Sequence, residues 1–241
     1  MAARIVEDFY VDNALFGFDD ISHATEAQTQ LIKMLKTGGF ELHKWASNCP
    51  ELLQIIPEAD REELTCVGGS VNEVIKALGL LWDPTMDQLL FVSPSAVPCK
   101  LPTKRQVLLL VASMFDPTGT AAPVVLIGKL LMQRIWERRV GWDEPIPTDL
   151  VKDFEDFLEA VCDVNMIRIP RMVVITNASA YELHGYADAS QFAYGACVYV
   201  KSIVSGEPPV VRLLCAKSKL VPKSVLTIPR KELWLLVCCT V

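Results

Sequence analysis

Several common signatures are missing from this 241-residue sequence, and each absence excludes a class of protein. No CxxC pair occurs among its eight cysteines, and its three histidines lie far apart, which argues against a zinc site. Its most apolar runs, residues 107–115 and 233–241, fall well short of the roughly 20 residues that a membrane span needs. The N-terminus lacks the charged, apolar and small-residue succession of a signal peptide. We therefore expect no membrane association and a cytoplasmic or nuclear protein with reduced thiols, not a secreted one.

The composition is that of a packed globular protein. Hydrophobic residues make up 51% of the chain and charged residues 22%, which excludes disorder and coiled coil. The net charge of −6 argues against a polyanionic partner, but the charge is unevenly distributed. Between Lys201 and Lys231, seven basic residues accompany a single acidic one, Glu207. This basic segment fits either a nucleic-acid contact or an ordinary solvated face.

The first part of the chain contains, in order, patterns typical of a strand, a helix, a short strand and a hairpin. These patterns span Ile5–Val11, Ser22–Thr37, Phe40–Trp45 and Leu78–Val92. Consecutive glycines at 38 and 39 end the predicted helix. Prolines at 94, 98 and 102 then mark a domain boundary.

The middle of the chain is predicted to be helical. Thr103 and Gln106 fit a capping box that opens a helix reaching about Met114, and a turn follows at residues 116–119. Pro123 opens a second helix that reaches Arg139. Its basic residues fit a phosphate backbone or a solvated face equally well; they are Lys129, Arg134, Arg138 and Arg139.

A third helix is predicted to begin at Thr148, which caps it, and its apolar stripe indicates core packing. The stripe consists of Leu150, Phe154, Phe157, Leu158 and Val161. After it, the period of the pattern changes to that of strands. Three successive strands and a final helix from Pro229 are predicted, the strands over Tyr181–Ala187, Ala193–Lys201 and Val210–Lys217. This order is half of a mixed α/β domain.

Three acidic residues are candidates for metal chemistry. Asp188 ends the first of these strands and Glu232 lies in the first turn of the final helix, so both can converge on one Mg²⁺. Two such ions would support phosphodiester cleavage. The alternative is that Asp188 is an ordinary turn residue and that Glu232 is a favourable negative charge at the start of a helix. Asp12 lies at a predicted hairpin tip, where Asp-Asn is also ordinary turn chemistry.

Read together, segments along nearly the whole chain resemble the polyprotein of BEL/Pao-type retrotransposons. They run in the order of that polyprotein, from the end of the reverse transcriptase palm into the ribonuclease H domain. The segments are Tyr10-Val-Asp-Asn13, the run of residues 39–48, Ala77-Leu-Gly-Leu-Leu-Trp82, the run of residues 113–119 through Pro123, His184-Gly-Tyr-Ala-Asp-Ala-Ser190, Ala216-Lys-Ser-Lys219 with Pro222, and Ile228-Pro-Arg-Lys-Glu-Leu233. The resemblance implies a fragment of an RNA-directed DNA polymerase and ribonuclease H.

The fold class that the resemblance implies is a multi-lobe α+β and α/β protein with three parts. Residues 1–102 would be the C-terminal part of a palm with a primer-grip-like hairpin, and residues 103–171 a helical thumb and connection. Residues 172–241 would be the N-terminal half of a ribonuclease H-like domain with an incomplete mixed sheet.

The resemblance also implies site residues and partners. Asp12 would belong to a polymerase metal site, and Asp188 and Glu232 to a ribonuclease H site, both with Mg²⁺. The partner would be a nucleic acid, either an RNA–DNA hybrid or a primer–template. The residues that would contact its backbone are Lys217, Lys219, Lys223 and Arg230.

Departures from the family pattern limit the expected activity. Asn13 stands where the palm motif has its second Asp, and ribonuclease H uses four carboxylates, of which relatives place two beyond the residue matching Val241. We therefore expect a catalytically inactive isolated chain, with a nucleic-acid-binding module without catalysis as the alternative. A third alternative is an aspartic peptidase, which needs Asp-Thr/Ser-Gly loops. The most similar string in this sequence is Asp116-Pro-Thr-Gly119, in which Pro117 stands where the loop requires Thr.

Overall fold

The structure is a computed structural model that describes residues 8–10, 13–63, 65–66, 73–77, 80–91 and 101–221. The chain forms two compact units, the first of Met1–Ala77 and Trp82–Gln88, the second of Leu78–Leu81 and Leu89–Val241. Several predicted features lie outside the described residues. They are Asp12, Glu232, Lys223, Arg230, most of the expected strand at residues 5–11, and the expected final helix from Pro229.

The first unit is built on helix α2 (Ile21–Thr37), which confirms the predicted helix. The Asp20 carboxylate caps its N-terminus by accepting a hydrogen bond from the His23 N–H at 2.8 Å. One face is buried through Ala24, Ala27 and Leu31. The helix ends at Gly38, and Gly39 adopts a φ of +78°, which favours glycine.

Short elements complete this unit. They are β1 (Phe9–Tyr10), β2 (Asn13–Ala14), α3 (Pro50–Leu53), the 3-10 helix η1 (Glu58–Asp60), β3 (Thr65–Cys66) and β4 (Glu73–Ala77). β1 pairs with β2, and β3 with β4, both antiparallel. The strand predicted over Phe40–Trp45 is wrong, since only one bridge forms there, from Trp45 to Arg61. Lys44 adopts a φ of 57°, which interrupts an extended backbone.

The predicted hairpin is confirmed as β5 (Leu80–Asp83) and β6 (Gln88–Leu90), joined by a turn. The Asp83 carboxylate holds that turn by accepting hydrogen bonds from the backbone N–H groups of Thr85 and Met86, at 2.9 and 3.0 Å. The boundary between the two units runs through this hairpin.

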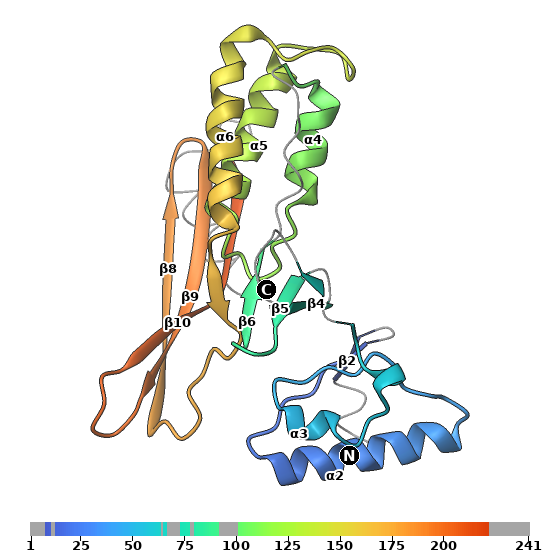
Figure 1. The fold of residues 1–241 in the computed structure, drawn as a ribbon. Helices are drawn as coiled ribbons and strands as arrows, with labels where there is room; N and C mark the ends of the chain where they lie inside the picture. Colours follow the sequence, from blue (N-terminus) through green and yellow to red (C-terminus); the bar gives the residue numbers. More distant parts are fainter. Residues whose placement is uncertain are drawn as a thin grey trace. The chain divides into compact units, whose positions relative to one another are not determined.

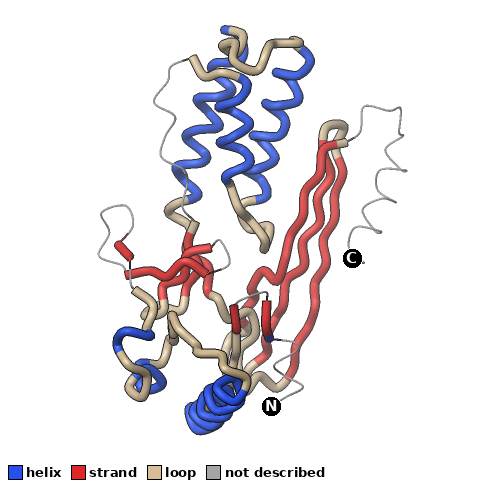
Figure 2. Tube along the Cα trace, turned by 90° about the vertical axis from the view of Figure 1, so that its right-hand side faces the viewer, coloured by secondary structure: helices blue, strands red, loops and turns tan. Residues whose placement is uncertain are grey.

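Three helices lie side by side in the second unit (Figures 1 and 2). They are α4 (Lys104–Ser113), α5 (Ala122–Glu137) and α6 (Val151–Val164). The capping box of Thr103 and Gln106 is confirmed, and the apolar stripe of α6 enters the shared core. The predicted cap at Thr148 is wrong. Thr148 begins the 3-10 helix η2 (Thr148–Leu150), and α6 follows it directly with no side-chain cap.

Three long antiparallel strands form the other half of the second unit (Figure 2). They are β8 (Ala180–Ala189), β9 (Ala193–Ile203) and β10 (Val210–Leu220), in the order β10-β9-β8. All three predicted strands are therefore confirmed, each somewhat longer than predicted. A short strand, β7 (Arg168–Pro170), leads from α6 toward them and lies next to β6 in the order of another sheet.

Within the described part of the chain, no helix has both the length and the apolar character that crossing a bilayer requires.

Candidate nucleic-acid interface

Asp188 lies near the C-terminal end of β8 and is exposed to solvent. The register pairs it with Gly195 of β9, which is paired in turn with Ser218 of β10. Because directly opposed residues of a sheet point to the same side, these three residues share one face. The Asp188 Oδ1 accepts a hydrogen bond from the Ala189 N–H at 2.8 Å.

Lys217 and Lys219 lie on the opposite face of the same sheet. They are paired with Ala196 and Tyr194 of β9, one residue on either side of the Gly195 position. Both lysines are exposed, and neither forms an ion pair with another described residue. The register therefore separates the predicted catalytic Asp188 from these two predicted nucleic-acid contacts. All three assignments stay predictions.

The face that carries Asp188 also carries a polar network that sequence analysis did not identify. Lys201 Nζ donates a hydrogen bond to Glu182 Oε2 at 3.0 Å, and His184 Nε2 lies 3.1 Å from the same oxygen. Chiefly the bond from Lys201, and then that from His184, lowers the pKa of Glu182. Lys201 is therefore a cation of this sheet whose charge is already compensated. Strand alternation together with the cross-strand pairing of Glu182 and Lys201 is the signal that could have found it.

Two of the basic residues of α5 are engaged within the second unit. Arg134 forms an ion pair with Asp153, and Arg138 with Asp149. Sequence analysis left α5 open between a phosphate contact and a solvated face. For these two arginines the ion pairs favour a solvated face, because each guanidinium already has a carboxylate partner.

The loop between α4 and α5, residues 115–121, holds the half-buried side chain of Asp116. Burial raises the pKa of this carboxyl, and the raising outweighs the hydrogen bonds that the backbone N–H groups of Ala121, Gly119 and Thr120 donate to it. Its Oδ1 is buried without a partner among the described residues.

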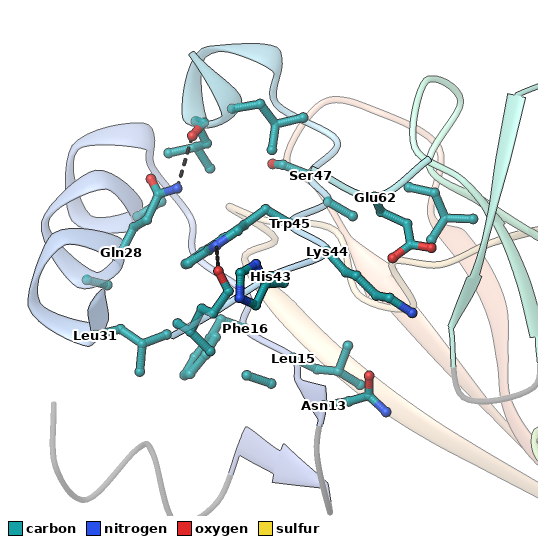
Figure 3. Close-up of a pocket in the computed structure, with 18 of the residues that line it drawn as sticks. Asn13, Leu15, Phe16, Gln28, Leu31, His43, Lys44, Trp45, Ser47 and Glu62 are labelled. Carbon is teal, nitrogen blue, oxygen red and sulfur yellow. Dashed lines mark hydrogen bonds between the residues drawn. The ribbon is translucent and has the colours of Figure 1, made fainter. Parts of the chain in front are cut away.

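The first unit contains a cavity of about 500 Å³ whose lining includes Asn13 of β2 (Figure 3). Much of its wall is apolar, with Leu31 from α2 and Trp45 from the segment before α3. Gln28 Nε2 donates a hydrogen bond to the Leu52 carbonyl at 3.0 Å. Glu62 is the one acidic residue in the described lining, so this wall alone supplies no cluster of carboxylates.

A comparison with models of protein families shows to which family the chain belongs. The family model described as Pao retrotransposon-like RNaseH-like domain matches residues 103–240, which is more than half of the sequence. The chain belongs to this family. No curated protein matches it. The predicted resemblance to a Pao-type retrotransposon polyprotein is thus confirmed over the RNaseH-like region. The match covers α4–α6 together with β8–β10.

RNaseH-like domains commonly work with Mg²⁺, so the donor set around Asp188 can be tested for its fit to that ion. Magnesium needs carboxylate and other hard oxygen ligands. In the described portion of the chain, no three His, Cys, Asp or Glu side chains come together as a metal site. On its own face, Asp188 has Gly195 and Ser218 as cross-strand neighbours. The described residues therefore do not form a magnesium site by themselves, and Glu232 lies outside them.

The structural role of Asp116 also bears on the alternative of an aspartic peptidase. Such an enzyme needs two carboxyl groups that share one proton. In this RNaseH-like domain the Asp116 carboxylate instead accepts hydrogen bonds from the loop that begins α5. This arrangement favours a structural use of the Asp116–Gly119 segment.

Proposed function

We propose that this Pao-type RNaseH-like domain binds the phosphate backbone of an RNA–DNA hybrid through the exposed face of β10. The observation that carries the proposal is the pair Lys217 and Lys219, exposed on one face and free of ion pairs to other described residues. Two residues along a strand span about 7 Å. This spacing lets the two ammonium groups contact neighbouring phosphates of one strand.

Four other cations of the second unit are less available for such a contact, because each has a carboxylate partner within the unit. The pairs are Lys201 with Glu182, Arg105 with Asp143, Arg134 with Asp153, and Arg138 with Asp149. A compensated cation attracts phosphate less strongly than a free one. The contrast supports β10 as the binding strand despite the net negative charge of the chain.

The test is the salt dependence of binding. Anisotropy of a labelled RNA–DNA hybrid is measured against the full chain at several salt concentrations between 50 and 300 mM. Each phosphate contact contributes about 0.9 to the slope of log K against log salt. The double variant Lys217→Gln/Lys219→Gln should lower that slope by nearly two, and the single variants by about one each.

Lys201→Gln is the matched control, because this lysine lies on the other face of the same sheet and is paired with Glu182. Its slope should equal that of the wild type. An unchanged slope in the double variant would contradict the proposal. A DNA primer–template measured in parallel distinguishes hybrid binding from general duplex binding, and we expect the hybrid to bind more tightly.

We further propose that the isolated chain binds without cleaving. Support comes from the donor set, since Asp188 and Glu232 are two of the four carboxylates that ribonuclease H uses, and among the described residues no metal-holding cluster includes Asp188. Incubation of a labelled hybrid with the chain across a range of magnesium concentrations should give no cleavage above background. Cleavage that disappears in Asp188→Asn would overturn this part and leave the binding proposal intact.

The reading of residues 1–102 as the C-terminal part of a reverse transcriptase palm is also a proposal. It is supported by the antiparallel pairing of Tyr10 with Asn13, the two described residues of the Tyr10-Val-Asp-Asn13 motif. The β5–β6 hairpin is the proposed counterpart of the primer-grip-like segment. Primer–template affinity should fall in the double variant of β10 and should not fall in Asp12→Lys, because that substitution replaces a negative charge with a positive one.

A further inference from the structure

The α4–α5 loop touches β10 at the residues next to its lysines. Gly119 has a φ of +78°, and a Cβ built on it would lie 1.8 Å from the carbonyl oxygen of Ala216. That neighbour is backbone and cannot swing aside as a flexible side chain can. Only glycine therefore permits the loop and the strand to come this close.

Two hydrogen bonds hold β10 to this loop and to the start of α5. The Ala216 N–H donates to the Thr118 carbonyl at 2.8 Å, and Ser218 Oγ donates to the Ala122 carbonyl at 3.3 Å. Ala216 and Ser218 are the two neighbours of Lys217. The loop and the start of α5 thus hold the two residues that flank this lysine.

β10 needs such a support because it is an edge strand of the β10-β9-β8 sheet. An edge strand has one side without ladder hydrogen bonds, so it frays or changes register more easily than a central strand. A slip by one residue would move Lys217 and Lys219 to the face that carries Asp188. The loop removes this freedom at the site of the lysines.

Asp116 lies within this loop. Hydrogen bonds from the backbone N–H groups of Gly119, Thr120 and Ala121 and from the Thr118 side chain act to lower the pKa of its carboxyl group, although burial raises it by more. These donors belong to the residues that approach β10. The Phe-Asp-Pro-Thr-Gly segment and the Ala-Lys-Ser-Lys segment, about a hundred positions apart in the chain, are therefore two halves of one contact.

We propose that residues 115–121 position Lys217 and Lys219 for the phosphate backbone, with Gly119 and Ser218 as positioning residues. The proposal rests on the proposed function, since it concerns how the binding strand is held. The loop itself contacts no nucleic acid and acts through β10.

The test measures hybrid binding by the full chain carrying Gly119→Ala. Loss of the close approach should raise Kd about tenfold at 100 mM salt and lower the salt slope by one to two, as removal of the lysines does. Hydrogen exchange of the peptide covering residues 210–220 should become faster in the same variant. Ser218→Ala removes a single hydrogen bond without adding atoms, and it should raise Kd about two- to threefold with a smaller drop in slope.

Gly128→Ala is the matched control for lost stability. It strains α5 against side chains of α4 and α6 and lies away from the loop. Measured well below its unfolding temperature, it should keep the wild-type salt slope. A wild-type slope in both Gly119→Ala and Ser218→Ala, or an equal drop in Gly128→Ala, would overturn the positioning role. If the lysine variants themselves leave the slope unchanged, the proposed function fails instead.

Discussion

Gly128 of α5 lies where side chains of the neighbouring helices leave no room for a methyl group. A Cβ at this position would lie 2.7 Å from both Phe157 Cζ and Val111 Cγ2, and 2.8 Å from Phe157 Cε2. Ordinary carbon contacts are about 3.5–4.0 Å, so both neighbours would have to move by about 1 Å. Phe157 and Val111 are buried in the shared core, which leaves them little space to do so.

The magnitude for Gly128→Ala follows from two opposing effects. Overpacking of a well-packed core costs about 1–3 kcal/mol. Alanine recovers up to about 1 kcal/mol through its higher helix propensity. We expect a net loss of about 1–2 kcal/mol in the free energy of unfolding, measured by urea denaturation with circular dichroism at 222 nm.

A double-mutant cycle separates this reasoning from a general effect of substitution. Phe157→Leu deletes Cζ and Cε2, two of the three atoms closest to the new methyl group, so Gly128→Ala should cost about 1 kcal/mol less in that background. Gly185→Ala is the control, because nothing lies within 4 Å of its Cβ position, and stability should be unchanged or slightly higher. An equal cost of Gly128→Ala in both backgrounds, or a gain in stability, would refute the packing argument.

Two further predictions concern charged groups of the second unit. Burial raises the pKa of Asp116, so the folded state holds its proton more tightly than the unfolded chain, whose Asp pKa is about 3.9. The stability that this group contributes is full below about pH 4 and is lost as pH rises through the folded pKa. The unfolding temperature of Asp116→Asn should therefore rise relative to that of the wild type as the pH is raised from 4 to 7. A difference in unfolding temperature that does not vary with pH would contradict this. Arg134→Met, which breaks a partly exposed pair with Asp153, should cost about 1 kcal/mol and leave the salt slope of hybrid binding unchanged; a drop of one in that slope would assign α5 to the interface.

Local patterns were sufficient to predict much of the second unit. Thr103 and Gln106 predict the start of α4, because a capping box involves only two residues that are three positions apart in the sequence. The stripe at Phe154, Phe157 and Val161 marks the buried face of α6 because helical periodicity is local too. Alternation likewise predicted β8, β9 and β10.

The failures and omissions have non-local causes. The strand predicted to end at Trp45 does not form because Lys44 takes a positive φ, a conformation that the side-chain pattern does not reveal. The approach of Gly119 to Ala216 joins segments about a hundred residues apart, and a single sequence offers no periodicity over that separation. The positions of Asp188 and Lys217 on opposite faces follow from register, which the sequence motifs leave unspecified.

In the proposed function, β10 presents Lys217 and Lys219 to nucleic acid. Acetylation of lysines by a small amine-reactive reagent, read by peptide mass spectrometry with and without an RNA–DNA hybrid at low salt, tests it most directly. The hybrid should slow the modification of Lys217 and Lys219 several-fold and leave that of Lys201, and of the exposed Lys152 in α6, unchanged. Equal protection of all four lysines, or none at Lys217 and Lys219, would contradict it.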